Sequence, residues 1–335
     1  MSATSIGDMA QHFMTLRQTT QIKSRMNQLA QELSTGRVAN LAAHLDGITS
    51  QVAALDRDLS ALGSFAQVSA RVAQTLEMQQ LALEQVDRHR QALTEQLLPI
   101  TTNSSVQTRQ DAARAGAAAF AVTVNLLNET QSGRSLFAGR ATDTPALAGA
   151  DAMLTDLAAA IGPLTDPADI LVAIDTWFDD PAGGFATMGY TGDTGADRTA
   201  KVSANDSLRL SARADDPALR AVLKGHAIAA MVDRIGVGWT ERTQENLLVE
   251  AGNRLLSAGE PLVGLRAGIG AEQGRLAELE TERNARSTAF SIARVGLTEA
   301  DPFETASRLQ DVQTQLELHY TMTARLNRLS LVNYL

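Results

Sequence analysis

Residues 45–97 read LDGITSQVAALDRDLSALGSFAQVSARVAQTLEMQQLALEQVDRHRQALTEQL, and this stretch decides the fold. Its apolar side chains recur at alternating steps of three and four residues, beginning with Leu45, Ile48, Val52, Leu55, Leu59 and Leu62. After a break at Gly63–Ser64 the pattern resumes through Val68, Val72, Leu76, Leu83, Val86, Leu93 and Leu97. This period is typical of a heptad seam. A helix over about 41–98 would be roughly 90 Å long, so the stretch predicts a rod.

Composition supports helix packing and excludes several kinds of function. Hydrophobic residues make up 44% of the 335 residues but aromatic residues only 4%, which favours helical bundles. The net charge is -9, and no run of basic residues offers the surface that nucleic acid or an anionic membrane needs. The chain has no Cys, which excludes disulfides, thiolate nucleophiles and Cys-ligated metals.

The first residues and the hydropathy of the chain lead to two further expectations. Residues 1–8 lack both the cationic and the apolar region of a secretory signal, so we expect no cleavable signal peptide. No apolar run reaches the roughly 18 residues that a membrane span needs.

Both ends of the chain carry apolar stripes of their own. Ile6, Met9, Phe13 and Leu16 form one stripe, and a second one of different phase runs through Ile22, Met26, Leu29 and Leu33 to a helix stop at Gly36. Near the other end, residues 301–304 form a capping box that begins a helix carrying Leu309, Val312, Leu316, Tyr320, Leu326 and Leu329. Leu329, Leu331, Val332, Tyr334 and Leu335 crowd its last turn.

The middle of the chain differs in composition. Residues 106–131 predict a helix rich in small residues that folds back on the first rod helix. Between 138 and 215 lie four of the eight prolines and the aromatic residues Trp177, Phe178, Phe185 and Tyr190. Asp166–Pro167 predicts the start of a short helix that turns Ile170, Ile174, Trp177 and Phe178 inward. Val202, Leu208, Leu210 and Ala212 alternate with polar residues as in strands.

The second half of the chain predicts a return of the rod. Asp216–Pro217 begins a helix with Leu219, Val222, Ile228 and Val232 on one face, and one long helix follows with Leu247, Ala251, Leu255, Leu262, Leu265, Ile269, Leu276 and Leu279. We therefore expect a mainly α fold, in which a long antiparallel coiled-coil rod of N- and C-terminal halves carries a small inserted α+β domain. The expected segments are 1–40, 41–137, 138–215, 216–296 and 297–335.

Apolar stripes at chain ends predict assembly, because chain ends are usually frayed and polar. For the long segments around 45–98 and 245–290, an intramolecular coiled coil explains the pattern equally well. For the extreme ends, packing between neighbouring subunits explains the wide apolar spread better. The expected subunit interface comprises Met9, Phe13, Leu16, Ile22, Met26, Leu29, Leu33, Leu309, Val312, Leu316, Tyr320, Leu326, Leu329, Leu331 and Leu335.

Two segments carry a resemblance to the flagellin family. Residues 29–38, LAQELSTGRV, resemble the motif in which the family's N-terminal helix ends. Residues 264–276, GLRAGIGAEQGRL, resemble its C-terminal Gly/Ala, Arg and Leu stretch, and Ala300–Asp301 stands where the family has an acidic turn. Val38–Asn40 and Pro302 depart from the family pattern, so the resemblance leaves the local contacts there open.

Two further segments are similar to one branch of that family, the proteins that join hook and filament. These are GRSLFAGRATDTP at 133–145 and RLNRLSLVNYL at 325–335. The resemblance implies a structural protein that is exported unfolded through the flagellar type III apparatus and guarded by a cytoplasmic chaperone. Outside the cell, identical subunits would form a ring between hook-associated protein 1 and flagellin. A minor flagellin and a cytoplasmic coiled-coil signalling protein are the alternatives.

Reactive chemistry has little support in the sequence. The histidines at 12, 44, 89, 226 and 319 have no metal-ligand spacing. Residues 268–274 only faintly resemble a dinucleotide fingerprint, and residues 193–197 lack the distal acidic ligand of a calcium loop. We interpret the four clustered aromatic residues as the core of the insertion. We expect no enzyme activity, catalytic residue, cofactor or metal.

Overall fold

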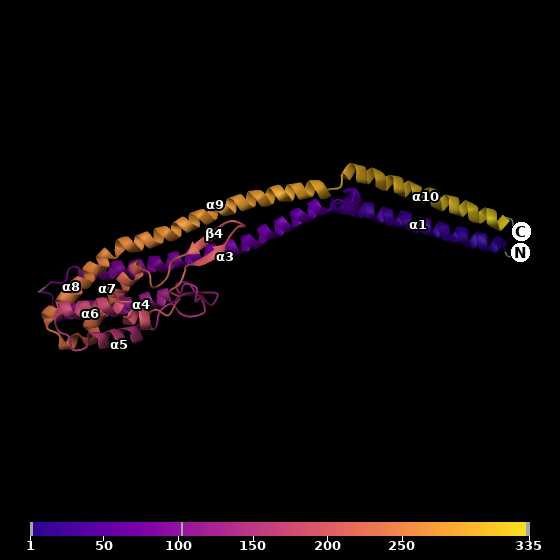
Figure 1. Cartoon of the computed structure of the whole chain (residues 1–335). Coiled ribbons are helices and arrows are strands. Elements are labelled where there is room, and N and C mark those ends of the chain that lie inside the picture. Colours follow the sequence, from indigo (N-terminus) through magenta and orange to yellow (C-terminus); the bar gives the residue numbers. More distant parts are fainter. Residues whose placement is uncertain (1–2, 102, 333–335) are drawn as a thin grey trace. The chain divides into compact units, whose positions relative to one another are not determined.

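The computed structural model describes residues 3–101 and 103–332, with side chains for 9–10, 12–101 and 103–325 (Figure 1). The fold is mainly α, as predicted. The helices are α1 (Ala3–Thr35), α2 (Leu41–His44), α3 (Ser50–Leu97), α4 (Val106–Leu127), α5 (Ala150–Ile161), α6 (Pro167–Asp179), α7 (Pro217–Ile235), α8 (Glu241–Ser257), α9 (Gly259–Thr298) and α10 (Pro302–Val332). A π-helix (Phe185–Gly189), a 3-10 helix (Gly236–Gly238) and strands β1 (Thr130–Gln131), β2 (Arg134–Ser135), β3 (Arg198–Lys201) and β4 (Ser207–Leu210) complete the described elements.

The chain divides into two compact units. The terminal unit comprises Met1–Leu62 and Asn284–Leu335, and the central unit comprises Gly63–Arg283. The helices α3 and α9 each contribute residues to both units. Our division of the chain into five segments is finer than this one and stays a prediction.

The core of the central unit is built around α7. Its backbone lies closest to α4, where a Cβ added to Gly116 would be only 2.4 Å from the Cβ of Ala229. The close approach that the small residues of α4 suggested is therefore present. We expected α4 to fold back on the first rod helix, but α7 is its closest neighbour because two small-residue faces allow the shortest separation.

The insertion forms the elements that its sequence predicted. The Asp166 carboxylate caps α6 by accepting a hydrogen bond of 2.9 Å from the Ala168 amide. Trp177 and Phe178 are buried with ring centroids 4.7 Å apart, and Trp177 Nε1 donates to Asp156 at 2.7 Å. Strands β3 and β4 pair as an antiparallel hairpin. A second hairpin, β1–β2, precedes the insertion and was not predicted.

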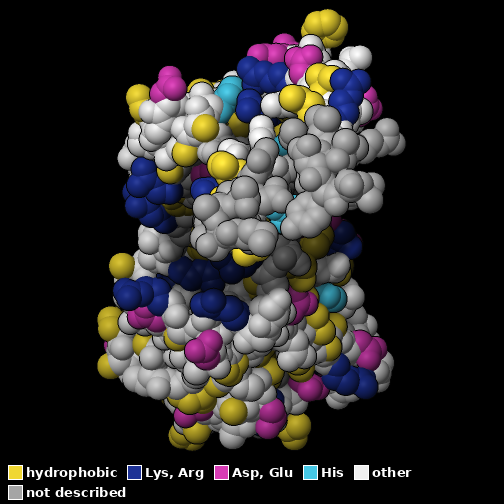
Figure 2. Space-filling model, turned by 90° about the vertical axis from the view of Figure 1, so that its right-hand side faces the viewer, with side chains coloured by type: hydrophobic (Ala, Val, Ile, Leu, Met, Phe, Trp, Pro, Cys, Tyr) yellow, Lys and Arg dark blue, Asp and Glu magenta, His cyan; other side chains and the backbone are white. Residues whose placement is uncertain are grey.

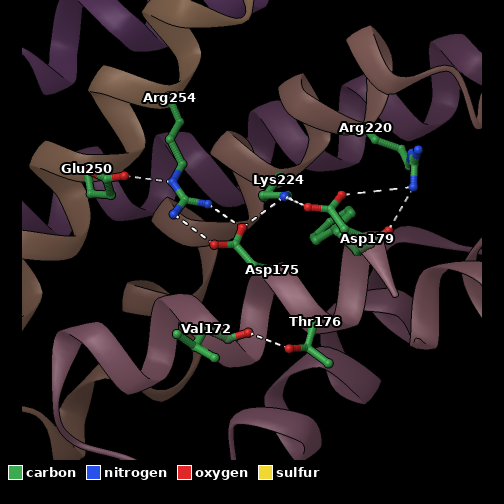
Figure 3. Close-up of polar contacts among 9 residues, drawn as sticks. Val172, Asp175, Thr176, Asp179, Arg220, Lys224, Glu250 and Arg254 are labelled. Carbon is green, nitrogen blue, oxygen red and sulfur yellow. Dashed lines mark hydrogen bonds and ion pairs between the residues drawn. The ribbon is translucent and has the colours of Figure 1, made fainter. Parts of the chain in front are cut away.

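A network of charged side chains fastens α6 to α7 and α8 (Figure 3). The Asp175 carboxylate on α6 contacts Lys224 Nζ at 2.9 Å and Arg254 Nη1 at 2.5 Å. Lys224 also pairs with Asp179, and Arg254 Nε lies 2.8 Å from Glu250. Burial would raise the pKa of Asp175, but hydrogen bonds and charge from Arg254 and Lys224 outweigh it and lower the pKa.

The first long helix differs from its prediction at its start. It begins at Ser50 and not near 41, because residues 45–49 are not helical and Asp46 and Gly47 have φ values of 47° and 81°. Leu45 and Ile48 therefore do not belong to its seam. The helix continues through Gly63–Ser64, as predicted, although the heptad pattern is interrupted there, since an isolated glycine costs a helix only about 1 kcal/mol.

The C-terminal half of the chain also differs from its prediction. Residues 241–298 form two helices, α8 and α9, separated at Ala258, and not one. Pro261 explains the separation, because a proline ring collides with the carbonyl four residues earlier and is tolerated only in the first turn of a helix. Among the described helices, none has both the length and the apolar character that a bilayer crossing demands.

Candidate assembly interface

The helices α1 and α10 pair within the terminal unit. Ile22 and Leu29 of α1 and Val312 of α10 are each 7% exposed and pack together. Met26, Leu309 and Leu316 are half-buried against them. Because residues late in α1 meet residues early in α10, the two helices are antiparallel. Six of the expected interface residues thus contact one another within the chain.

Two backbone hydrogen bonds join the end of α1 to the segment just before α10. As predicted, α1 ends before Gly36, which has a φ of 66°. The Gly36 carbonyl accepts a hydrogen bond of 3.0 Å from the Ala300 amide, and the Val38 amide donates to Thr298 at 3.0 Å. These bonds lie beside Val38–Asn40 and Pro302, the positions at which the sequence departs from the family pattern.

The Asp301 side chain caps α10. It accepts hydrogen bonds from the amides of Phe303 at 2.8 Å and Glu304 at 3.1 Å. The second half of the predicted capping box is different, because the Glu304 carboxylate contacts Arg308 at 2.5 Å.

Toward the chain ends, the contact between α1 and α10 becomes polar. His319 Nε2 lies 3.3 Å from the Thr15 carbonyl and 3.1 Å from Thr19 Oγ1. The Lys23 ammonium lies 5.8 Å from the centre of the Tyr320 ring, within the range of a cation–π contact. Among the described side chains, the apolar contact of the pair therefore lies in the half nearest Gly36 and Ala300.

The outer half of α1 carries apolar side chains that do not take part in the pair. Met9, Phe13 and Leu16 are 62%, 64% and 49% exposed. Their spacing of four and three residues places them along one face of the helix. This is the first of the two stripes that the sequence distinguished by their phase. The phase difference has a structural meaning, because Ile22, Met26 and Leu29 of the second stripe pack against α10, whereas Met9, Phe13 and Leu16 of the first are exposed.

Helix α10 also carries exposed apolar side chains. Leu318 and Met322 are 60% and 63% exposed, and Tyr320 and Leu33 of the expected interface are also exposed. Sequence reasoning missed Leu318, Met322 and the exposed Met14 of α1, since none of them falls on the heptad positions. Exposed hydrophobic side chains also occur elsewhere, as the scattered yellow atoms of Figure 2 show. Ile292 and Val295 of α9, for example, are also exposed and lie three residues apart.

Four expected interface residues lie beyond what the structure describes. The side chains of Leu326, Leu329 and Leu331, and all of Leu335, are outside the described residues. For all fifteen residues, participation in contacts between subunits stays a prediction.

The buried histidine of the central unit has no feature of a reactive site. His226 Nδ1 lies 3.2 Å from Thr123 Oγ1, and burial, with smaller contributions from His89 and Arg90, lowers its pKa to about 3. It is therefore neutral at physiological pH. Among the described residues, no three His, Asp or Glu side chains gather as metal ligands would.

The mainly α fold and the pairing of the first and last helices define a class of protein, the mainly helical proteins whose two ends form one antiparallel helix pair. The chain belongs to the flagellin family. Residues 8–142 match the bacterial flagellin N-terminal helical region, and residues 241–335 match the bacterial flagellin C-terminal helical region. It is accordingly a structural component of the flagellum, outside the cell, that assembles with other flagellar proteins and is not an enzyme.

A solved structure shares this fold. The chain is similar to one described as a flagellar hook-associated protein from Vibrio parahaemolyticus, with a TM-score of 0.51 and 14% sequence identity. The similarity covers 73% of this chain and 95% of that one. At this identity it supports the fold alone. No curated protein matches the chain significantly.

Proposed function

We propose that this chain is a junction adaptor of the hook-associated protein 3 branch, which forms a ring between hook-associated protein 1 and the first flagellin layer. Export unfolded through the type III apparatus, without a cleavable signal, and protection by a chaperone belong to the same proposal. The observation that carries it is the open face of Met9, Phe13 and Leu16 beside the closed contact of Ile22 and Leu29.

The mechanism of this adaptor is burial of apolar surface. Fully burying one side chain such as Leu, Met or Phe contributes about 1.5–3 kcal/mol. The open faces of α1 and α10 therefore supply much more stabilisation when neighbouring subunits cover them than either helix gains inside one chain. Function then depends on how well the terminal helices of neighbouring subunits fit together and on how their charged residues align. It does not depend on a reactive group.

Two observations favour a junction role over a filament subunit. The segment at 133–145, which resembles the junction branch, is a structural element of the central unit: Phe137 is fully buried and its carbonyl accepts a hydrogen bond of 2.9 Å from Ala214. Gly139 has a φ of 64°, and an added Cβ would lie 2.9 Å from the Asp193 carbonyl, so only glycine fits. The similar fold described as a flagellar hook-associated protein is the second observation.

Immunogold electron microscopy tests this proposal. An antibody against residues 140–215 is applied to intact cells of the source organism, with a deletion strain as the control. Gold confined to the boundary between hook and filament is the expected result.

A minor flagellin is the second candidate, because both matching family models describe flagellin itself. Gold along the whole filament would favour this candidate and reject the junction role. Gold on no external structure would reject both the junction role and the filament role.

A further inference from the structure

The central unit contains a cleft whose charge is positive and uncompensated. Its volume is about 450 Å³, and it lies between α3, the β1–β2 hairpin and the β3–β4 hairpin. Three arginines line it, Arg71, Arg134 and Arg198, and none of its lining residues is acidic. Val68, Val72, Leu136 and Leu210 form its apolar part.

These arginines differ from others in the same unit. Arg213 and Arg254 each contact a carboxylate, at 2.9 Å and 2.5 Å respectively. Within the described part of the chain, no carboxylate lies at ion-pair distance from the three arginines of the cleft. The Arg134 guanidinium donates to the Thr142 hydroxyl, with Nε at 3.2 Å and Nη2 at 3.0 Å. That hydroxyl in turn donates to the Asp143 carboxylate at 3.4 Å, so Arg134 meets a carboxylate only through Thr142. Burial, and then the charge of Arg134, lowers the pKa of Arg198, so the two guanidinium groups repel each other.

A buried hydroxyl in the wall of the cleft is a second and independent observation. Ser135 is 2% exposed, and its Oγ has no hydrogen-bond partner. A buried hydroxyl without a partner is destabilising, and a ligand that accepts its hydrogen bond would remove this cost. The adjacent turn is also unusual, because Ser132 has a φ of 50° although it is not a glycine. Such backbone strain is often found at binding sites.

We propose that this cleft binds an oxyanion, a carboxylate or a phosphate, through Arg71, Arg134 and Arg198, with the Ser135 hydroxyl as an additional donor. Guanidinium groups bind both kinds of oxyanion through paired N–H donors. The ligand would neutralise the repulsion between Arg134 and Arg198 and satisfy Ser135 at the same time.

Thermal unfolding of the full chain tests the proposal, with inorganic phosphate as the probe and chloride at equal ionic strength as the reference. At about ten times its Kd, phosphate should raise the Tm by about 3 °C. Arg71→Gln and Arg198→Gln should each weaken phosphate binding by about tenfold, since each removes a charge-assisted hydrogen-bonding group. Arg71 is exposed on α3, so its replacement leaves the fold intact.

Arg209→Gln is the matched control. Arg209 is exposed on β4 and does not line the cleft, and the alternation of side chains along a strand places it on the opposite face of β4 from Leu210, which does. This variant should keep the full phosphate effect. The proposal fails if phosphate and chloride give the same Tm, or if Arg71→Gln and Arg198→Gln keep the effect of the parent chain.

The oxyanion has two sources, a free anion or an acidic side chain of an adjoining subunit, and the second rests on the proposed function. Inhibition of assembly by phosphate, but not by chloride, together with weaker assembly of Arg198→Gln, would assign the site to a neighbouring subunit. Assembly that phosphate does not inhibit would assign it to a free anion. Immunogold labelling at an unexpected location would reject the junction role and leave phosphate binding unaffected.

Discussion

The terminal helix pair and the core of the central unit contain similar apolar side chains but bury them to different extents. Helix α7 buries twelve of its 19 residues, including Leu223, Ile228 and Met231. Helix α1, with 33 residues, buries only Ile22 and Leu29 among its described side chains. Met9, Phe13 and Leu16 are apolar but exposed. The central unit therefore contains its own stabilisation, whereas under the proposed function neighbouring subunits complete that of the terminal helices.

Limited proteolysis should show this difference most strongly. Trypsin should cut at Arg17, Arg25, Arg37 and Arg325 long before it cuts the central unit, by roughly two orders of magnitude in rate. The reason is that cleavage requires local opening, and a helix with few buried contacts opens more often. Mass spectrometry of a digestion time course identifies the order of cuts. Terminal helices that resist trypsin in the monomer would contradict the assembly argument.

A pair of phenylalanine substitutions measures this difference in burial as a difference in the free energy of unfolding. Phe178→Ala should destabilise the central unit by about 3–5 kcal/mol, because Phe178 is 1% exposed and stacks on Phe185 with ring centroids 5.6 Å apart. Phe13→Ala should change monomer stability by less than about 0.5 kcal/mol, because Phe13 is 64% exposed. Denaturant unfolding of the monomer measures both. Equal losses would mean that the terminal face is already buried in solution.

An aspartate on the open face of α1 should affect assembly without affecting the fold. Phe13→Asp should weaken incorporation into the flagellar structure by about 2 kcal/mol or more, because a carboxylate then occupies a site that assembly buries. Electron microscopy and sedimentation of assembled material measure the loss. Gln18→Asp, which adds the same charge at another exposed position of α1, is the control. Normal incorporation of Phe13→Asp would show that this face is not a contact between subunits.

Sequence periodicity predicted the helices well, because each buries a face whose spacing is visible in the residue pattern. The capped starts at Asp166 and Asp216 and the stop at Gly36 were predicted correctly, since their signals are local. The partner of α4 was not, because small residues indicate close approach without indicating to which helix. The start of α3 at Ser50 was also not predicted, because the apolar spacing continues through Leu45 and Ile48 although residues 45–49 are not helical.

The candidate interface was predictable only in part. The two phases of the α1 stripe are visible in the sequence, but which of them contacts α10 became clear only from the structure. The polar contact of His319 with Thr15 and Thr19 lies between the exposed stripe of α1 and the stripe that contacts α10. A single histidine among polar residues carries no signal of that role. The arginine cleft was missed for a similar reason, because Arg71, Arg134 and Arg198 are far apart in the sequence.

The smallest expected effect concerns the charged network around Asp175. Since its pKa is lowered in the folded chain, its contribution to stability is present above the ordinary aspartate pKa of about 4 and is lost as the pH falls through the lower, folded value. Asp175→Asn should therefore cost about 1 kcal/mol or less at pH 7, a modest figure because the carboxylate is partly exposed and screened. The difference from the parent chain should shrink as the pH falls toward 3.

Urea unfolding of the monomer at pH 7 and pH 3 measures this change. Asp151→Asn is the control, because Asp151 also pairs with an arginine, Arg234, but its side chain is 87% exposed. Its replacement should have little effect at either pH. A loss for Asp175→Asn that is equally large at both pH values would mean that the network acts through packing and not through charge. The central unit would then depend on its apolar core alone, which would make its contrast with the terminal helices sharper.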